Sequence, residues 1–459
     1  EQLDTTVFNV KEFGSIASVV SSVIDTGMES NSFLVCNLAA VVKQLIQWRA
    51  ELPMVQPHYA VKCNPSPVIV RLLASLGCSF DCATMGEIDM VVNHLGDKLS
   101  FAGTPGKAAT GIVYANPAKF DHMLQFAMES GVRMTVFDGE DELHKIAKLV
   151  GTNGTHPGYP LQLLLRITTD DKHSICKFSG KFGCPVDEAR ELLVIAKDLG
   201  LHVVGVSFHV GSGCRDAGAY TTALKHTAQI FNWGLELDMT PMHIVDIGGG
   251  FPGESHLSAQ SASNGYNCPS FHDIARVVRT SIVSFCTGLN RPMDSFHFIA
   301  EPGRYFVATA TTIATKVYSR KGGKQNYQAL YVDNGVYGSF NTVVYDHAAP
   351  VPKKLTTEMA YINKTKNKSK TTSKALSRTD SMSSNDSLSS MVSDMTIVAA
   401  YHSPSGCVTP PRECEDNQDN HELGIPTAVF GPTCDGLDQM CDMENTLLDR
   451  CEVDDWLIW

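Results

Sequence analysis

The chain has 459 residues, 43% of them hydrophobic and 19% charged, so it is long enough to bury a sizeable core. Its net charge of −12 argues against nucleic acid and anionic membrane surfaces as partners. No apolar run reaches the roughly 18 residues of a membrane span, and the N-terminus shows no signal-peptide pattern.

Residues 1–33 are expected to form a strand, Thr6–Phe8, and a short helix that join a β-rich domain. From residue 34 to 308, short apolar runs alternate with stretches of helical period such as Glu188–Leu199. The runs are 58–61, 112–115, 134–137, 161–167, 203–209, 243–247 and 296–300. This alternation predicts a parallel sheet, and its seven or eight repeats favour a closed (β/α)8 barrel over an open sheet.

A second, β-rich domain is predicted for residues 309–352 and 425–459, because 311–318 and 329–332 are β-rich without helices between them. Since the chain stops at Trp459 inside an apolar, strand-like stretch, we expect this domain to be truncated at its C-terminus. Residues 353–424 are rich in Lys, Ser, Asp and Asn, which predicts a disordered insert. The insert is either a phosphorylated segment or a tolerated surface loop. Gly103–Gly111 resembles a smaller insertion.

The 14 cysteines include no Cys-x-x-Cys pair, and several lie in or beside apolar runs. This favours a reducing compartment over a disulfide framework. The group formed by His402, Cys407, Cys414 and His421 fits no zinc spacing. We therefore expect a cytoplasmic protein without a metal site.

Lys62 ends the apolar run 58–61, where a barrel strand would meet its loop. Barrels place their chemistry at this C-terminal mouth. A lysine held inside the mouth would lose hydration, which lowers its pKa and makes the amine nucleophilic toward an aldehyde. The alternative is an ordinary lysine on the solvated rim.

Three glycines, Gly248–Gly250, follow the run 243–247 and let backbone N–H groups approach an anion such as phosphate. The segment is neither a P-loop nor a dinucleotide-binding fingerprint, and a purely structural turn is equally compatible. At the end of the run 203–209, His209 can lie flat against an aromatic ring, and Ser212 can donate to phosphate. The alternative for His209 is a structural role.

Glu301 and Arg304 flank a Pro-Gly turn after the run 296–300 and can face one ligand. Glu301 can hold a pyridine nitrogen protonated and Arg304 can clamp a phosphate, unless the two simply pair with each other. Cys434 and Asp435 lie side by side in a Gly/Pro-rich loop that can present an acid to a reaction centre. The alternative for Cys434 is a bystander thiol.

Seven segments occur in this order: YAVKCN, FDCAT, VGVSFHVGSG, DIGGGFPG, EPGRY, GVYGSFN and GPTCDGLD. Together they closely resemble the eukaryotic ornithine decarboxylases, pyridoxal-phosphate-dependent group IV decarboxylases of the alanine-racemase-like fold. The resemblance runs from about residue 30 to about residue 350 and resumes at about residue 424. It implies a (β/α)8 barrel, a β-domain, and a head-to-tail homodimer with two shared active sites.

The resemblance implies a site for pyridoxal 5′-phosphate made of a Schiff-base lysine, an acidic pair, an arginine, a histidine stacked on the ring, phosphate ligands and a carboxylate at the pyridine nitrogen. The Schiff-base lysine would be Lys62, the acidic pair Asp81 with Glu87, and the arginine Arg166. His209 would stack on the ring, and Glu301 would be the carboxylate at the pyridine nitrogen. The phosphate ligands would be Ser212, Gly248, Gly249, Gly250 and Arg304. Cys434 would reach into the partner's site and protonate the carbanion left by CO2, while Asp435 helps to hold the distal amine. The substrate would be ornithine, and the product putrescine, in the first step of polyamine synthesis.

The chain departs from the family at two places. The family usually reads Asn-Asp-Gly where this chain reads Asp333-Asn334-Gly335, so its substrate-facing aspartate aligns with Asn334. An amide loses the charge–charge part of the contact with an amine, and Asp333 would restore it only after a backbone shift. The chain also ends before the family's Gly-Ala-Tyr segment, whose tyrosine contacts the cofactor phosphate.

Three functions therefore stay open: an ornithine decarboxylase, a related lysine/ornithine decarboxylase, and a pseudoenzyme like the family's antizyme inhibitors. The pocket residues named above are present, which favours an enzyme. Residues 119–142 align with the family's antizyme-binding segment, so an antizyme partner is compatible with all three.

Overall fold

The computed structural model describes residues 6–9, 13–95, 111–151, 155–156, 159–253, 269–322, 326–346, 348–356, 396–399 and 424–459. The chain divides into two compact units, Val41–Thr309 and a second unit of Glu1–Ala40 with Ala310–Trp459. No helix in the described part of the chain is long and apolar enough to cross a membrane.

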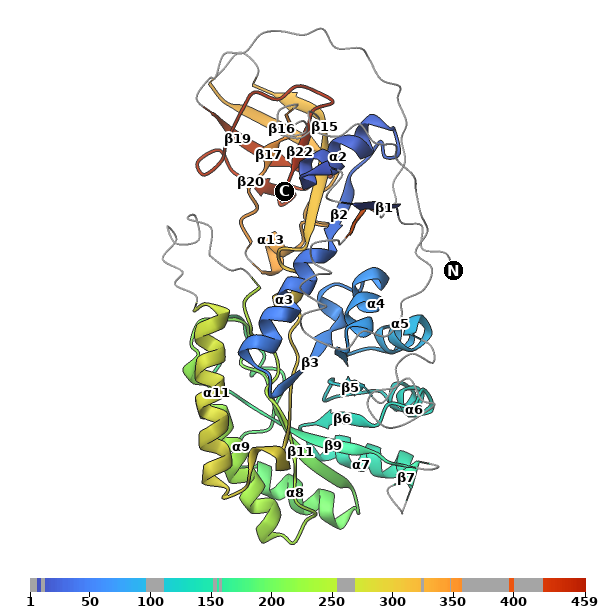
Figure 1. Cartoon of the computed structure of the whole chain (residues 1–459), viewed down its shortest axis with the longest axis vertical. Coiled ribbons are helices and arrows are strands. Elements are labelled where there is room, and N and C mark those ends of the chain that lie inside the picture. The colour runs from blue at the N-terminus through green and yellow to red at the C-terminus, as the bar shows by residue number, and fades with distance from the viewer. Residues whose placement is uncertain are drawn as a thin grey trace. The chain divides into compact units, whose positions relative to one another are not determined.

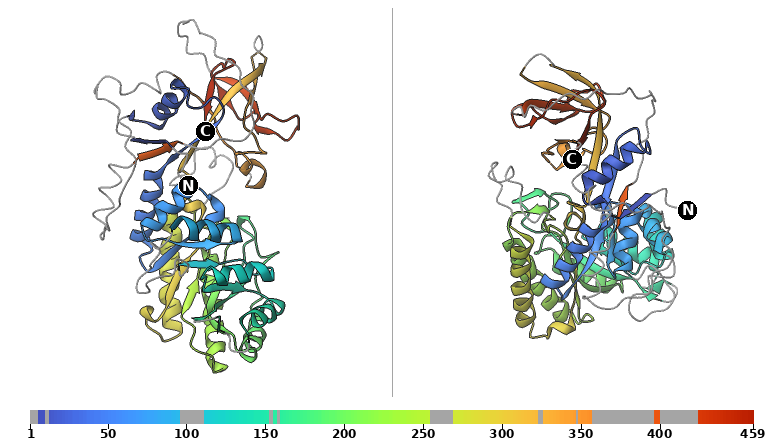
Figure 2. Two further views of the ribbon diagram at one scale, coloured as in Figure 1. Left: turned by 90° about the vertical axis from the view of Figure 1, so that its right-hand side faces the viewer. Right: turned by 45° about the horizontal axis from the view of Figure 1, so that its top comes forward.

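The first unit is built on eight parallel strands that close into a barrel (Figures 1 and 2). In the order in which they pair around it, the strands are β3 (Val55–Ala60), β4 (Ser79–Cys82), β5 (Ile112–Tyr114), β6 (Met134–Phe137), β9 (Gln162–Ile167), β11 (His202–Phe208), β13 (Ile244–Asp246) and β14 (His297–Ala300). Because β14 pairs with β3, the sheet has no free edge. The predicted (β/α)8 barrel is confirmed.

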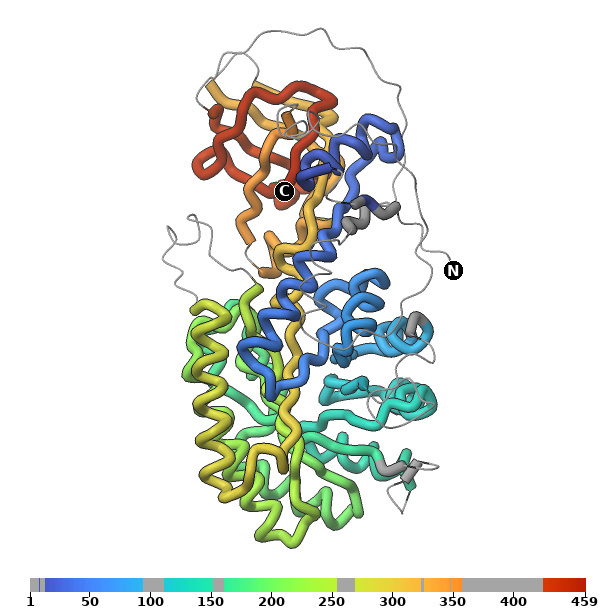
Figure 3. The backbone as a smooth tube through the Cα atoms, in the orientation of Figure 1, coloured from blue at the N-terminus to red at the C-terminus, as the bar shows by residue number. Residues whose placement is uncertain are grey.

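Helices connect successive barrel strands, and Figure 3 traces this alternation along the chain. They are α4 (Pro67–Ser75), α5 (Met85–Leu95), α6 (Asp121–Glu129), α7 (Glu140–Val150), α8 (Ala189–Asp198), α9 (Gly218–Glu236) and α11 (Phe271–Gly288), while α3 (Leu38–Glu51) precedes β3 and the short α12 (Arg304–Val307) follows β14. Their starts are set locally. In α11, for example, Ser270 Oγ accepts the Asp273 N–H at 3.2 Å and so caps the first turn.

Aliphatic side chains fill the barrel. The cluster comprises Val113, Ala115, Val136, Leu164, Val204, Ile244 and Ile299. Because this interior is apolar and packed, polar chemistry is confined to the strand ends. One short hairpin, β7 (Thr155–His156) with β8 (Tyr159–Pro160), and one separate antiparallel pair, β10 (Ser174–Cys176) with β12 (Ser212–Cys214), lie in the connections. Short 3-10 turns occur at η1 (Val61–Cys63) and η3 (Met293–Ser295).

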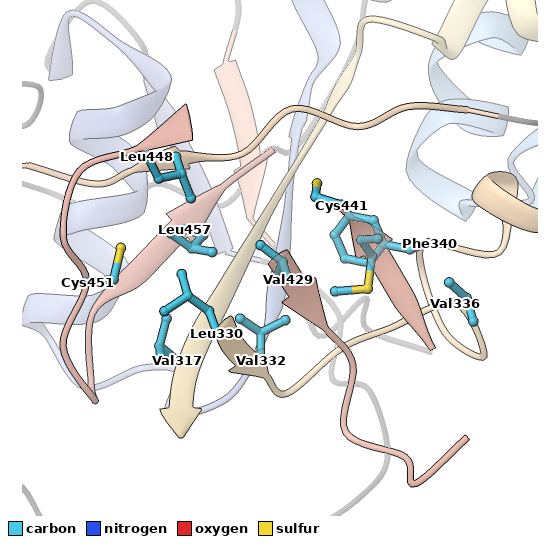
Figure 4. Close-up of a cluster of buried hydrophobic side chains, with 11 residues drawn as sticks. Val317, Leu330, Val332, Val336, Phe340, Val429, Cys441, Leu448, Cys451 and Leu457 are labelled. Carbon is cyan, nitrogen blue, oxygen red and sulfur yellow. The ribbon is translucent and has the colours of Figure 1, made fainter. Parts of the chain in front are cut away.

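Among the described residues, the second unit forms a sheet of ten strands, as predicted for a β-rich domain. Its strands are β1 (Thr6–Asn9), β2 (Phe33–Asn37), β15 (Thr311–Lys321), β16 (Gln328–Val332), β17 (Lys353–Lys354), β18 (Thr396–Ala399), β19 (Ile425–Phe430), β20 (Gln439–Cys441), β21 (Leu447–Leu448) and β22 (Trp456–Ile458). Helices α2 (Ile16–Asp25) and α13 (Thr342–Tyr345) accompany it. Figure 4 shows side chains from β15, β16, β19 and β22 converging on one apolar cluster, with Leu330, Val429 and Leu457 among them.

The domain limits differ in two places from those predicted. β2 pairs with β15, so residues 33–37 belong to the sheet unit, and the barrel unit begins at residue 41 rather than 34. Two segments of the predicted insert, 353–424, form strands β17 and β18 of the sheet unit. Lys354 in β17 forms an ion pair with Asp455, and β18 pairs with β1 and β2. Most of the remainder of that insert, including the group from His402 to His421, and nearly all of Gly103–Gly111 lie outside the described residues.

Candidate active site

Lys62 lies in η1, directly after strand β3. Its Nζ donates a hydrogen bond of 2.6 Å to Asp81 Oδ2, and half of the lysine side chain is exposed. Asp81 is fully buried in β4, where the parallel register pairs it with Ala60, two residues before Lys62. The side chains of Lys62 and Asp81 therefore reach the same end of the barrel. This is the C-terminal end of the strands, where barrel enzymes carry their active sites.

The charges around Lys62 contradict the prediction that its pKa is lowered. Burial is the largest single influence and does lower it, but the carboxylates of Asp81, Glu301 and Glu87 together raise the pKa of Lys62 above the usual lysine value. Lys62 is therefore an ammonium ion paired with Asp81 at neutral pH. Asp81 Oδ1 is buried and has no hydrogen-bond partner within the described residues.

Glu87 has a structural task that sequence reasoning missed. Its Oε2 accepts the Ala83 N–H at 2.8 Å, and Thr84 Oγ1 accepts the Glu87 N–H at 3.2 Å. This arrangement resembles a capping box at the start of α5, which the spacing Thr84-x-x-Glu87 indicates, except that Glu87 binds the N–H of Ala83, one residue before Thr84. Burial raises the pKa of Glu87. The side chain thus fixes the helix after β4 while its charge acts on Lys62.

A second pair of acids lies where β13 and β14 end. Asp246 is fully buried and Glu301 is 5% exposed, and their carboxyl groups hydrogen bond to each other. Asp246 also accepts hydrogen bonds from Ser207 Oγ at 3.1 Å and from the Gly248 N–H at 2.9 Å. Burial raises the pKa of Asp246 to about 6, and burial with the Asp246 charge raises the pKa of Glu301 well above its usual range.

Sequence reasoning singled out Glu301 but not Asp246 or Ser207. The available signal was an acid that ends an apolar strand immediately before three glycines. A charged residue at the buried end of a strand needs a partner, and here the partner comes from the neighbouring strand.

The glycines after β13 bring three loops together. Gly248 has a φ of +63°, and a Cβ there would lie 2.1 Å from a backbone oxygen of β11. A Cβ on Gly249 would lie 2.6 Å from His209 Nε2. Tyr220 Oη donates to the Gly249 carbonyl at 2.9 Å, and the Glu301 N–H donates to the Gly248 carbonyl at 2.7 Å. Side chains at these positions would therefore separate the loops after β11, β13 and β14.

His209 is held as a neutral imidazole. Its Nδ1 accepts the Gly211 N–H at 2.9 Å, which leaves the proton on Nε2. Burial lowers the pKa of His209 well below the usual value, and the charges of Arg166 and Lys62 lower it further. Phe178 meets the imidazole edge-on, with ring centroids 4.8 Å apart.

Arg304 begins α12, and its Nη2 donates to Ser212 Oγ at 3.3 Å. A Cβ on Gly303 would lie 2.9 Å from Cys63 Cβ, so the loop after β14 packs against the turn that carries Lys62. Arg166 lies on β9, with its guanidinium carbon 5.1 Å from the ring centre of Phe182. Three positive side chains therefore accompany the acids at this end of the barrel.

In the sheet unit, Asp333 and Asn334 follow β16, and both bind the backbone. Asp333 accepts the Ser32 N–H at 2.6 Å and the Lys316 N–H at 2.9 Å. Asn334 Oδ1 accepts the Ser339 N–H, and its Nδ2 donates to Ser339 Oγ, each at 3.0 Å. Asn334 is only 6% exposed. These two side chains therefore hold the sheet and the turn that follows it.

Cys434 and Asp435 lie on an exposed loop that Asp438 ties to the turn after β16. Asp438 is 1% exposed and accepts hydrogen bonds from the Val336 N–H at 2.9 Å and from Thr433 Oγ1 at 2.7 Å. Tyr337 Oη donates to Asp435 Oδ2 at 2.5 Å. Both predicted residues are solvent-exposed in the described chain.

The barrel unit thus gathers most of the predicted site. The residues that lie at its strand ends are Lys62, Asp81, Arg166, His209, Ser212, Gly248, Gly249, Gly250, Glu301 and Arg304. The predicted substrate residues Asp333, Asn334 and Asp435, with Cys434, belong to the sheet unit.

Comparison with known proteins points to one family. The family model for the pyridoxal-binding domain of pyridoxal-dependent decarboxylases matches residues 38–308. The ornithine decarboxylase of Schizosaccharomyces pombe is 39% identical over 328 residues, which cover 71% of this chain and 66% of that protein. Antizyme inhibitor 2 of Xenopus laevis is 37% identical over 361 residues, which cover 75% of this chain and 72% of that protein. This chain is therefore similar both to ornithine decarboxylases and to an antizyme inhibitor.

A solved structure agrees with the fold. The arginine decarboxylase of the Paramecium bursaria Chlorella virus has a TM-score of 0.71 to this chain at 26% identity, covering 96% of this chain and 93% of that one. The similarity thus extends over both units.

Proposed function

This chain belongs to the family of pyridoxal-dependent decarboxylases, and from that membership we propose that it converts L-ornithine to putrescine, the first step of polyamine synthesis. The observation that supports this best is the Lys62–Asp81 ion pair at the mouth of a closed barrel. Glu301 lies close enough to act on the same lysine. An amine, a buried acid beside it and a second buried acid are the groups that the chemistry requires.

The residues at the barrel mouth fit pyridoxal 5′-phosphate. Asp81 Oδ1 and Glu301 Oε1 are buried acceptors without a donor among the described residues, so they suit a ligand that brings its own N–H or charge. Arg304 and Ser212 lie together, and the loops that carry them pack against the loop of glycines, so they supply donors for a phosphate. The bound cofactor would supply the electron sink for the bond broken between Cα and the carboxylate.

The barrel residues then have distinct tasks. Lys62 would bind the cofactor's aldehyde carbon, and Asp81 would hold the nitrogen in place and stabilise its positive charge. His209 would pack on the ring as a neutral imidazole, consistent with its lowered pKa. Glu301 would keep the proton at the ring nitrogen, and Arg166 would add positive charge to the pocket.

A second copy of this chain would complete each site. Besides Cys434 and Asp435, the loop and the turn expose large apolar side chains: Tyr337 is 62% exposed and Leu437 is 71% exposed. Apolar groups of this size are often covered by another protein surface. We place Cys434 and Asp435 of one copy in the site of the other, where the Cys434 thiol would donate a proton at the substrate's Cα and Asp435 would bind the distal amine.

The choice of substrate follows from the acids available at that surface. Asn334 is neutral and committed to its turn, and Asp333 is committed to the backbone of Ser32 and Lys316. Asp435 is then the carboxylate that recognises the distal amine. A single carboxylate binds ornithine and lysine with less discrimination than two would, so we propose ornithine as the main substrate and lysine as a slower one.

The test is release of labelled CO2 from ornithine and, separately, from lysine, with pyridoxal phosphate added. Turnover of ornithine that disappears in Lys62→Ala supports the proposal. Lys148→Ala is the matched control, because its side chain is 79% exposed and its pairing with Asp121 is loose at 3.9 Å. A folded, cofactor-loaded protein that turns over neither amino acid would overturn the decarboxylase reading.

The similarity to antizyme inhibitor 2 favours one alternative, an antizyme-binding pseudoenzyme. Residues 119–142, which include α6, are the segment proposed to bind antizyme. Binding of a recombinant antizyme together with absent turnover would establish this alternative. Binding together with turnover would instead show an enzyme with antizyme as its partner.

A cytoplasmic location is proposed on the state of the cysteines. The cysteines among the described residues, Cys63 and Cys434 among them, are all free thiols. Free thiols are typical of a reducing compartment. Location of a tagged full-length chain in fractionated cells would test this.

A further inference from the structure

Asp246 has contacts that the proposed roles leave unexplained. Its two carboxylate oxygens accept from Ser207 Oγ and from the Gly248 N–H, and its carboxyl group also hydrogen bonds to Glu301. Asp246 has no exposed surface, so it cannot touch substrate from solvent. It lies at the end of β13, directly beside β14, which carries Glu301 at its end.

Two buried carboxyl groups in contact hold a proton between them. If both were ionised, two negative charges would face each other without water, which is strongly unfavourable. Ser207 and Gly248 donate to Asp246 only, so they favour the charge on Asp246 and leave the proton on Glu301. The directions of both pKa shifts agree that the pair is hard to ionise fully, since the pKa of each carboxyl group is raised above its usual value.

We propose that Asp246 is a positioning residue that holds Glu301 as a carboxylic acid, so that Glu301 carries the proton required at the pyridine nitrogen before the cofactor binds. The inference rests on the proposed function in one respect, namely that Glu301 faces that nitrogen. Glu301 would pass its proton to the nitrogen and become a carboxylate, while Asp246 stays ionised throughout. The proton leaves the Glu301 carboxyl group and arrives at the nitrogen, so none is drawn from solvent.

Other charged groups act on the same pair from neighbouring elements. Asp81 on β4 raises the pKa of both carboxyl groups, and Lys62 and Arg166 lower that of Glu301. Among the influences on Glu301 other than burial, the Asp246 charge is the largest. Asp246 is therefore the residue whose removal changes the proton on Glu301 most.

The first measurement needs no cofactor. Infrared difference spectra of the full chain against Glu301→Gln would identify the carbonyl stretch of the protonated Glu301, and its pH titration would give a midpoint. In Asp246→Asn we expect this midpoint to fall by about one pH unit or more, because a neighbouring negative charge is lost. In Ser207→Ala we expect it to rise, because the Asp246 charge loses a donor and the doubly ionised pair becomes harder to form, so the pair keeps its shared proton to a higher pH. A loss of packing alone would not move the two variants in opposite directions.

The second measurement counts protons as pyridoxal phosphate binds. Calorimetry in two buffers of different ionisation enthalpy, at a pH where the free ring nitrogen is unprotonated, gives the net uptake. Asp246→Asn should take up about one more proton than the unmodified chain, since proton exchanges elsewhere are common to both proteins. The buried Asp438→Asn in the sheet unit is the control, and it should show the same uptake as the unmodified chain.

The outcomes separate this inference from the proposed function. Absence of the protonated Glu301 band, or equal proton uptake by Asp246→Asn and the unmodified chain, would overturn the inference even if ornithine is decarboxylated. Failure of the unmodified chain to bind pyridoxal phosphate would overturn the proposed function and the proton-supplying role together, while the infrared titration would still show whether the pair exists. Opposite midpoint shifts in Asp246→Asn and Ser207→Ala, together with uptake of one extra proton by Asp246→Asn, support the inference.

Discussion

The ammonium group of Lys119 lies 2.9 Å from Glu142 Oε1, although the lysine side chain is fully buried and the glutamate is 6% exposed. Lys119 Nζ also donates to the carbonyls of Asn116 and Val136, each at 2.8 Å. The pair thus joins the loop after β5, strand β6 and helix α7. Burial lowers the pKa of Lys119 to about 8.

Removing one partner of this pair should destabilise the barrel. Because the other charge would stay buried without compensation, we expect Glu142→Gln to cost about 3–5 kcal/mol in unfolding free energy. The double variant Lys119→Met with Glu142→Met should lose less than the two single variants together. Denaturant unfolding followed by circular dichroism measures this, and Lys172→Met, which breaks an exposed ion pair, should change little. Additive losses would show that the two charges do not interact.

His58 should make the barrel sensitive to acid. Burial lowers the pKa of His58 to about 3, with a smaller contribution from the charge of His297. Between the unfolded value of about 6.5 and the folded value, the unfolded chain binds more protons, so stability should fall as the pH falls through this window. The stability of His58→Gln should fall less steeply between pH 6 and pH 4 than that of the unmodified chain, as melting curves recorded at each pH would show. His144→Gln, at an exposed position, should leave the slope unchanged.

Gly249→Ala should weaken cofactor binding while the barrel still folds. A Cβ at this position would lie 2.6 Å from His209 Nε2 and 2.9 Å from the Glu301 carbonyl, so both groups must move. We expect at least a tenfold loss of affinity for pyridoxal phosphate, which corresponds to about 1.4 kcal/mol. Absorbance titration would measure it. Gly288→Ala is the control, since nothing lies within 4 Å of its added Cβ.

Two inactive variants should restore activity to each other if the sites are shared. Lys62→Ala removes the amine from one unit, and Cys434→Ala removes the thiol from the other. If chains exchange at random into dimers with shared sites, about a quarter of full activity should return on mixing, because half of the dimers are mixed and each holds one complete site. If the subunits exchange but no activity returns, Lys62 and Cys434 either share a site within one chain or share no site.

The strands were predictable where they are mostly apolar, as in 134–137 or 203–208. β4 was not among the predicted apolar runs, because Asp81 interrupts a strand of four residues. The site residues whose spacing matches a motif were found, but the raised pKa of Lys62 was not, since it depends on acids from three other elements. Asp246 was missed for the same reason: its partners, Ser207 and Glu301, come from separate strands that become neighbours only in the closed barrel.

The pairing of β16 with β19 has a consequence for how this chain can change in evolution. Gln328 and Thr427 are side-by-side partners although 99 residues separate them in sequence. The entropy lost in closing a loop grows only with the logarithm of its length, so halving or doubling a loop alters the free energy of folding by about 0.6 kcal/mol. Changes in length that fall between β17, β18 and β19, and not within these strands, would therefore alter the stability of the sheet little while the Asp438-anchored loop keeps its place.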